Sequence, residues 1–306
     1  MKKLKKTPVL LLLFNRPKYT LQLIKQLKKY LPTRVYIHCD GPREGNISDK
    51  KNCKKVIDII KKKLDWHCEK NFKIQKNNLG VREAIITGID FLFKKENKGI
   101  ILEDSIIPTE QFFSFCDCLL ERYQRNKNVS LISGWNPILN FKTNYSYIFS
   151  ELPKIWGWAT WKRTWLLYDR NMKTWPRLKR NRWMKNKLKK SFFFRFYWEK
   201  IFEDTYYKRT STWDYNLVYS DWINGTFSIV PKNNLVNNCD HADKKITTHI
   251  NNFIVNTTKK KINFPLSHPK KIDVDKNYDN KFYRKFYNFK IFFLKVFFSR
   301  LIKKNF

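Results

Sequence analysis

Short runs of aliphatic residues alternate with longer amphipathic segments through the first half of this chain, and this rhythm is the strongest constraint on its fold. The apolar runs lie at 8–14, 34–40, 72–75, 98–104 and 129–134. Apolar residues recur at helical spacing over 18–31, 54–64, 79–96 and 109–126. Such alternation is typical of parallel strands joined by crossover helices. The sequence therefore predicts an α/β fold with a Rossmann-like, mostly parallel sheet flanked by helices.

Polar residues follow three of these apolar runs at the point where each run ends. They are Asn15, Arg16, Asp40, Glu103 and Asp104. Ligands of open α/β sheets bind beyond the carboxyl ends of the strands, so we expect these side chains to share one edge. Taken singly, each also has an ordinary explanation as a turn residue, a helix cap or a surface charge. Together they favour a nucleotide site, because an arginine fork clamps a diphosphate and paired carboxylates hold a divalent cation.

The charge balance points toward an anionic partner. The chain has 306 residues, with 63 basic and 26 acidic side chains and a net charge of +37. Such a field attracts nucleic acid or an anionic membrane. The richness in Lys, Asn, Ile and Phe offers a plainer explanation, in which much of the charge is a solvated surface. Nucleic-acid binding stays a second hypothesis, supported by aromatic residues among the Lys and Arg of 173–200 but by no helix-turn-helix, zinc-finger, RRM or KH motif.

The cysteines and the N-terminus indicate a cytoplasmic protein. Six cysteines form no CxxC pair, which argues against a zinc site or a disulfide framework and makes a reducing compartment the simpler expectation. The start "MKKLKKTPVLLLLFNRP" imitates a secretory signal, but no small-residue cleavage site follows it, and we interpret it as a strand. No apolar run approaches the ~20 residues that a membrane-spanning helix needs.

The second half of the chain contains two further candidates for chemistry. Asp214 lies in "TSTWDYNL", where neighbouring aromatic residues would raise its pKa toward the range of a general base. A helix-capping aspartate is the alternative. His249, in "KKITTHI", is a candidate metal ligand or phosphate contact, although a lone histidine is more often neither.

A tryptophan cluster invites two explanations. Trp156, Trp158 and Trp161 lie in "WGWATWKRTW", where they either stack on a sugar ring or pack a core. Gly157 between them indicates a close approach of the backbone.

The ordered series of motifs resembles a known family. The motifs are "PVLLLLFNRP", "DGPRE", "NLGVREAIITGIDFLF", "GIILEDSIIPTEQFF", "LISGWN", "IWGWATWKRTW", "TWDYN" and "SIVPKNNLVNN". They are similar to bacterial nucleotide-diphospho-sugar glycosyltransferases of the GT-A fold, which in turn resemble the eukaryotic N-acetylglucosaminyltransferase that acts on N-glycans. The resemblance covers roughly residues 7 to 250 and rests above all on "WGWATWKRTW" followed by "TWD".

The resemblance implies a nucleotide-sugar donor, most simply a UDP-sugar, and an inverting reaction. Asp40 would lie near the nucleoside, Asp214 would act as catalytic base, and Asp104 with His249 would bind a manganese or magnesium ion. The donor-binding set implied is Asn15, Arg16, Asp40, Arg82, Glu103 and Asp104. The acceptor would be a saccharide or a lipid-linked saccharide of bacterial surface polysaccharide or lipopolysaccharide biosynthesis.

One position departs from the family pattern. The usual motif is Glu-Asp-Asp, and its last acid commonly contacts the metal, but this chain has Ser105 there. A hydroxyl is a far weaker ligand for a hard cation than a carboxylate. Three outcomes follow: Asp104 or a water replaces the lost ligand, the enzyme works without metal, or the protein binds nucleotide sugar without turning it over.

The predicted organisation is one glycosyltransferase domain and a tail. Residues 1–255 would form the domain, with a nucleotide-sugar half at about 7–135 and an acceptor half at 136–255, and 256–306 would be a basic amphipathic tail. At helical spacing one stripe of the tail is aromatic, formed by Phe282, Phe286, Phe289, Phe293 and Phe297. Such a helix binds the headgroup plane of an anionic membrane. We therefore expect peripheral attachment to the inner face of the cell membrane, with a packed or disordered terminal helix as the alternative.

Overall fold

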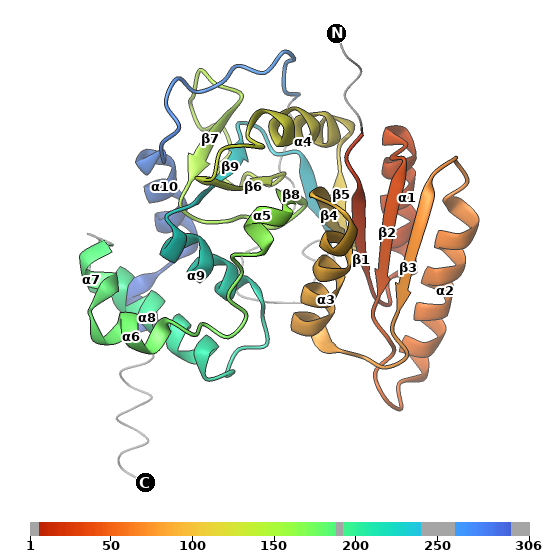
Figure 1. The fold of residues 1–306 in the computed structure, drawn as a ribbon, viewed down its shortest axis with the longest axis horizontal. Coiled ribbons are helices and arrows are strands. Elements are labelled where there is room, and N and C mark those ends of the chain that lie inside the picture. The colour runs from red at the N-terminus through yellow and green to blue at the C-terminus, as the bar shows by residue number, and fades with distance from the viewer. Residues whose placement is uncertain (1–5, 188–191, 240–260, 295–306) are drawn as a thin grey trace.

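A computed structural model describes residues 6–187, 192–239 and 261–294 of the chain. Its centre is an eight-stranded sheet in the order β3-β2-β1-β4-β8-β6-β9-β7 (Figure 1). In chain order the strands are β1 Val9–Leu13, β2 Arg34–Cys39, β3 Glu69–Ile74, β4 Lys98–Glu103, β6 Val129–Ser133, β7 Tyr147–Ser150, β8 Trp158–Trp161 and β9 Phe227–Pro231. Only β8 and β7 run against the other six. The predicted α/β class with a mostly parallel sheet is confirmed.

Helices cover both faces of this sheet, and a small second sheet lies beside it. The helices are α1 Pro17–Tyr30, α2 Ile47–Lys63, α3 Gly80–Lys95, α4 Glu110–Arg122, α5 Lys162–Trp165, α6 Trp175–Arg180, α7 Trp183–Lys187, α8 Phe192–Tyr206, α9 Asp214–Asn224 and α10 Lys276–Phe286. The small sheet pairs β5 Ile106–Pro108 antiparallel with β10 Val236–Asn238.

The first strand shows why a continuous apolar run folds at the centre of the sheet. All five residues of β1 are buried. Alternate side chains enter different cores: Leu11 packs with α1 and α2 on one face, while Leu10 and Leu12 pack with α3 on the other. A parallel strand covered on both faces needs apolar residues at every position. Figure 1 shows α3 on one side of the sheet and α1 and α2 on the other.

Two element boundaries differ from the sequence-based prediction. Helix α2 begins at Ile47 rather than at residue 54, because the side chain of Asn46 accepts a hydrogen bond from the N–H of Asp49 and caps it. Its polar first turns carry no apolar signal. Strand β3 begins at Glu69 rather than at residue 72, and as an edge strand it alternates exposed and half-buried residues.

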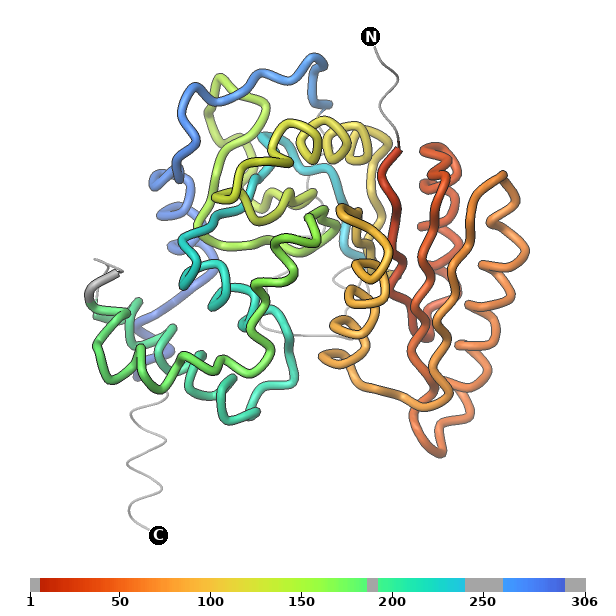
Figure 2. The backbone as a smooth tube through the Cα atoms, in the orientation of Figure 1, coloured from red at the N-terminus to blue at the C-terminus, as the bar shows by residue number. Residues whose placement is uncertain are grey.

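The C-terminal segment packs on the rest of the protein, which was the alternative to a membrane-binding tail. Helix α10 ends at Phe286, and Phe282 is buried against Trp135. Phe289 and Phe293 pack on the aromatic residues of α8. Figure 2 shows α10 lying against the second half of the chain. The protein itself therefore buries Phe282 and partly covers Phe286, Phe289 and Phe293, and Phe297 lies outside the described residues.

A buried polar contact fixes α10 in place. The carboxylate of Asp279 is fully buried and accepts hydrogen bonds from the hydroxyl of Ser150 (2.6 Å) and the N–H of Glu151 (2.9 Å). The buried ammonium of Lys154 donates to Ser150 at 2.8 Å and lies 4.4 Å from the ring centre of Phe282. The helix thus joins the core through charge and aromatic packing together. Nowhere in the described ranges is a helix both long and apolar enough to span a bilayer.

Candidate functional site

The carboxylate of Asp104 joins the ends of two central strands. It follows β4 and accepts hydrogen bonds from the N–H of Phe14 and from a guanidinium nitrogen of Arg16, both at 3.1 Å. The side chain of Asp104 is 6% exposed and that of Arg16 is 31% exposed. Glu103, half-buried, is the last residue of β4. The ends of β1 and β4 therefore carry the predicted acids and arginine side by side.

Asp40 fastens β2 to the start of α3. One of its carboxylate oxygens accepts hydrogen bonds from the N–H groups of Gly41 and Leu79, and the other accepts one from the side chain of Asn78, all at 2.9 Å. Burial raises the pKa of Asp40, and the backbone N–H groups oppose that rise. The residue thus positions the loop before α3 at the same edge of the sheet.

Asn15 contacts an acid that the sequence did not reveal. Its amide donates a 2.6 Å hydrogen bond to Asp49, in the first turn of α2. The pKa of Asp49 is lowered to about 2, mainly because the Arg43 guanidinium donates hydrogen bonds to its carboxylate. In the sequence Asp49 looks like an ordinary acid at the start of a helix. The only signal that it lies near the strand ends was the "GPREG" turn before it.

The electrostatics of one buried thiol show how close these strand ends lie. Burial raises the pKa of Cys39 to about 12, and the charges of Asp104 and Asp40 contribute to the rise. Both carboxylates therefore act on the same side chain at the end of β2. The structure brings Asn15, Arg16, Asp40 and Asp104 to one edge, as their positions after the strands predicted.

Arg82 lies on the first turn of α3 and reaches across to the second half of the chain. Its guanidinium donates to the carbonyl of Arg170 at 2.7 Å and to the carbonyl of Thr212 at 3.4 Å. Its side chain is 17% exposed. Arg82 therefore holds together the loops that precede α6 and α9, beside the strand edge.

Asp214 begins α9 in a half-buried position among tyrosines. The hydroxyl of Thr212 donates to its carboxylate. Burial raises the pKa of Asp214, opposed by that hydrogen bond and by backbone N–H groups. Burial also raises the pKa of Tyr215 and of Tyr287, and the charge of Asp214 adds to both shifts. A carboxylate with a raised pKa is a stronger base than an exposed aspartate, which makes Asp214 a candidate proton acceptor.

Two of the three predicted acceptor tryptophans are core residues. Trp158 is 2% exposed and stacks on Trp213, with ring centres 5.8 Å apart. Trp161 is equally buried, and its indole N–H donates to the carbonyl of Leu120. Because both side chains are buried, neither exposes a ring face on which a sugar could stack. The acceptor role predicted for Trp158 and Trp161 is wrong.

Trp156 keeps its candidate role. It is half-buried and lies at the edge where β8 begins, with its ring centre 4.1 Å from that of Trp135. Gly157 next to it has φ +59°, and a Cβ there would lie 2.8 Å from the Cγ1 of Val236. The close backbone packing expected at Gly157 is therefore present, and it fixes Trp156 at the sheet edge.

A hollow of about 640 Å³ opens beside Asp40, between the loops after β2 and β3. Three of its side chains are basic, namely Arg43, Lys50 and Lys76. Asn77 and Asn78, which precede α3, complete that wall. The sequence did not predict this hollow, because its two loops are about 30 residues apart and each reads as a polar turn.

The described residues do not by themselves supply a cation site. Within the described ranges no group of three or more His, Cys, Asp and Glu side chains is arranged to hold a metal ion. Asp104 is occupied by Arg16 and by a backbone N–H. Ser105 is buried, and its carbonyl accepts from the N–H of Cys239. His249 lies outside the described residues, so its metal role stays a prediction.

Comparison with known proteins gives distant likenesses to solved structures. No family model matches the chain, and no curated protein matches its sequence. Among solved structures, HddC from Yersinia pseudotuberculosis in complex with GMP-PN has a TM-score of 0.31 at 12% identity, covering 52% of this chain and 77% of that one. A putative glucose-1-phosphate thymidylyltransferase from Bacillus anthracis gives 0.31 at 11%, covering 53% and 74%. UDP-glucose pyrophosphorylase complexed with UDP-glucose gives 0.32 at 9%, covering 55% and 81%. Likenesses this weak carry no argument about function.

Proposed function

We propose that this protein is an enzyme that binds a nucleoside-diphosphate sugar at the carboxyl edge of its sheet and transfers the sugar to an acceptor hydroxyl. The observation that supports this most is the link between the two halves of the edge. Asp40 fixes the start of α3, and Arg82 on α3 holds the loop that presents Asp214. Helix α3 thus connects Asp40, which we propose contacts the nucleotide, with Asp214, the candidate base.

The donor would occupy the edge formed by β1, β2 and β4. Arg16, Arg43, Lys50 and Lys76 supply positive charge there for a diphosphate. Asp40 and Glu103 provide carboxylate oxygens that accept hydrogen bonds from ribose hydroxyls. UDP-sugars are the first donors to test, because the resemblance of the sequence motifs points to them.

The proposed reaction needs one proton acceptor. The carboxylate of Asp214 takes the proton of the acceptor hydroxyl as that oxygen bonds to the anomeric carbon of the donor. The bond from that carbon to the diphosphate breaks, and the electron pair leaves with the diphosphate. This direct displacement inverts the anomeric centre. Trp156, half-buried at the same edge, offers a ring face for the acceptor saccharide.

Metal dependence is part of the proposal but not of the steps above. A divalent manganese or magnesium ion would neutralise the departing diphosphate. Asp104 and His249 are the residues proposed to bind it. Donor turnover measured with and without manganese tests this part of the proposal. A stimulation that disappears in a His249→Ala variant, with nucleotide binding retained, would support those ligands.

A non-catalytic nucleotide-sugar-binding protein is the second candidate. The observation that favours it is the engagement of Asp104 with Arg16 and Phe14, together with Ser105 in place of the third acid. Calorimetric titration with UDP-sugars and with a duplex oligonucleotide distinguishes a nucleotide-sugar-binding protein from a nucleic-acid-binding protein. Turnover that is equal in wild type and in Asp214→Asn, with intact donor binding, would favour the non-catalytic candidate.

The place of this enzyme in a cell is also a proposal. Acceptors of surface polysaccharide or lipopolysaccharide assembly, carried by lipids, would place it at the inner face of a bacterial membrane. The predicted aromatic stripe does not support such attachment, because the protein buries or partly covers it as far as Phe293. Membrane attachment therefore requires a different surface.

A further inference from the structure

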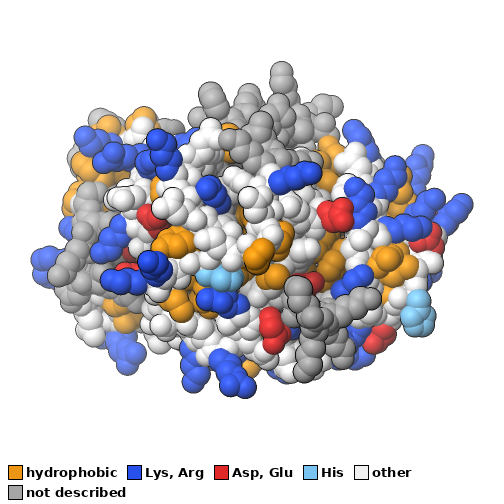
Figure 3. Space-filling model, turned by 90° about the horizontal axis from the view of Figure 1, so that it is seen from above, with side chains coloured by type: hydrophobic (Ala, Val, Ile, Leu, Met, Phe, Trp, Pro, Cys, Tyr) orange, Lys and Arg blue, Asp and Glu red, His pale blue; other side chains and the backbone are white. Residues whose placement is uncertain are grey.

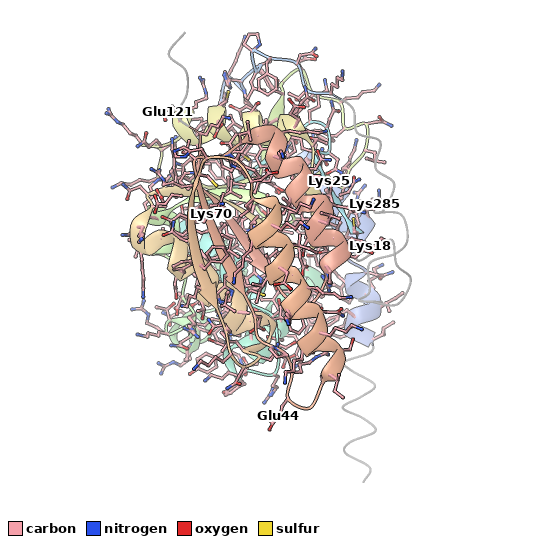
Figure 4. The ribbon with its side chains drawn as sticks, turned by 90° about the vertical axis from the view of Figure 1, so that its right-hand side faces the viewer. Lys18, Lys25, Glu44, Lys70, Glu121 and Lys285 are labelled. Atoms are coloured by element: carbon pink, nitrogen blue, oxygen red, sulfur yellow. The ribbon has the colours of Figure 1, made fainter. Side chains whose placement is uncertain are left out.

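Helices α1 and α2 present a surface whose basic residues are all lysine. They lie together on one face of the sheet, and Figure 4 shows Lys18 and Lys25 beside α1. Their apolar residues, such as Leu23 and Val56, face inward and are fully buried. The exposed basic residues of the two helices are Lys18, Lys25, Lys28, Lys29, Lys50, Lys51, Lys54, Lys55, Lys61, Lys62 and Lys63. We call this surface the lysine face.

The charge of the lysine face is not an average property of the molecule. Helix α1 contains no acid, and of the two acids of α2 Asp49 is buried and paired with Arg43. Of the other long helices, α10 is also basic, with four basic residues and one buried acid, whereas α3 and α4 are not. In α3 three basic residues accompany two acids, and in α4 one basic residue accompanies three acids. The two helices thus carry eleven lysines, and Figure 3 shows Lys and Arg at the end of the molecule that α1 and α2 occupy in Figure 1, as well as elsewhere on that face.

The residue types on the lysine face indicate which kind of polyanion it binds. Specific phosphate and base recognition favours the planar fork of arginine and exposed aromatic rings. The lysine face has neither, because Tyr30 is buried, Tyr19 is half-buried and no arginine lies on α1 or α2. Lysine ammonium groups on flexible side chains suit a partner whose negative charges are spread over a surface and can rearrange around them. An exposed isoleucine at the start of α2, Ile47, is 83% exposed and adds an apolar contact at the edge of the face.

From this geometry we propose that the lysine face binds an anionic lipid bilayer. Each lysine near such a surface strengthens binding several-fold, and the effect falls off within a Debye length. Lys50 belongs both to the lysine face and to the hollow beside Asp40. A bilayer held there would therefore lie next to the carboxyl edge of the sheet. The binding itself does not depend on the proposed enzymatic activity.

Sedimentation with vesicles tests this proposal in the full chain. The vesicles are phosphatidylcholine alone or phosphatidylcholine with one third phosphatidylglycerol, at low and high salt. We expect the wild type to bind only the anionic vesicles and to be released by salt. The variant Lys54→Glu/Lys55→Glu/Lys62→Glu should bind at least about a hundredfold more weakly, since each lysine is worth roughly a factor of five.

A matched variant separates this face from net charge. Lys94→Glu/Lys127→Glu/Lys142→Glu changes the charge by the same amount at exposed sites on other elements, and it should keep most of the vesicle binding. Equal losses in both variants would overturn the proposal, because net charge alone would then explain the binding. Duplex DNA bound more tightly than anionic vesicles, and lost only in the α2 variant, would overturn it in favour of nucleic acid. Far-ultraviolet circular dichroism checks that both variants are folded.

Discussion

The guanidinium of Arg82 donates a hydrogen bond to the carbonyl of Thr212, two residues before Asp214, across 130 positions of sequence. The hydroxyl of the same threonine donates to the carboxylate of Asp214. A single residue of α3 thus holds the segment whose side chain orients the candidate base. The position of that base therefore depends on a helix of the other half of the chain.

Removal of the Arg82 guanidinium should reduce turnover more than binding. In Arg82→Ala the loop that carries Asp214 loses its anchor, and a displacement near 1 Å can cost about a hundredfold in rate. We expect kcat with a UDP-sugar to fall by about ten- to a hundredfold while the nucleotide Kd changes little. Arg82→Lys should not restore activity, because lysine lacks the fork. Arg180→Ala, at an exposed position of α6, is the control, and a comparable loss there would refute the anchoring role.

The general base should be visible in a pH profile. Because burial raises the pKa of Asp214, the carboxylate loses its proton-accepting form at a higher pH than an exposed aspartate would. The value of kcat/KM should fall as the pH falls through this raised pKa. Asp214→Asn should lower kcat by about 10²–10⁴-fold and remove that acid limb. Persistence of the limb in the asparagine variant would assign it to another group.

Asp221 should make the stability of the fold depend on pH. It is fully buried, with Ser130 and Thr226 as hydrogen-bond donors, and burial raises its pKa from 3.8 to about 7. A raised folded-state pKa contributes stability that is complete below the unfolded pKa and is lost as the pH rises through the folded one.

Replacement of the Asp221 carboxylate should therefore change the free energy of unfolding most at neutral pH. Relative to wild type, Asp221→Asn should gain about 3–4 kcal/mol in unfolding free energy between pH 4 and pH 8, measured by urea titration. The asparagine oxygen and amide still face the two hydroxyls. Asp58→Asn, at an exposed position of α2, should show no such trend. A pH-independent difference for Asp221→Asn would contradict the buried-carboxylate explanation.

The contact between α10 and the core should be costly to break from one side. Burial lowers the pKa of Lys154 to about 8, and the charge of Asp279 opposes that effect. Asp279→Ala leaves a buried ammonium without its counter-charge, and we expect a loss of about 3–5 kcal/mol in chemical unfolding. The double variant Asp279→Ala/Lys154→Met should recover part of it. Simple additivity of the two single losses would show that the charges do not interact.

Gly157 should tolerate no side chain, for two separable reasons. Alanine there adopts an unfavourable positive φ and its Cβ meets Val236 and Ile106. Gly45 has φ +69° but open space around it, so Gly45→Ala isolates the backbone cost of about 1 kcal/mol. Gly157→Ala should lose at least about 1 kcal/mol more in thermal or urea unfolding. Equal losses at the two sites would show that the neighbours give way.

The sheet edge could be predicted from the sequence because its signals are local. The apolar runs of β1, β2 and β4 end at Asn15, Asp40 and Glu103, and parallel strands bring their ends together whatever surrounds them. The partners of these side chains could not be predicted. Asp49 looks like any helix-start acid, and its contact with Asn15 depends on how α2 packs beside β1.

The errors arise where a residue type has two roles and only tertiary structure selects between them. Trp158 and Trp161 are three residues apart and so point to opposite faces of β8, and because both faces are covered each is a core residue. The phenylalanine stripe of the tail has the spacing of a membrane helix, yet Phe282 finds Trp135, almost 150 residues earlier. Contacts of that range leave no local signal.

The seating of α10 has a consequence for the order in which the protein forms. A ribosome makes Trp135, Ser150 and Lys154 long before Asp279 and Phe282, their partners. The first half can close its sheet while synthesis continues, since β1 to β4 and their helices are contiguous. The tryptophan-rich half keeps part of its aromatic surface, such as Trp135, open to water until α10 arrives. During that interval the growing chain is most exposed to aggregation and most in need of a chaperone.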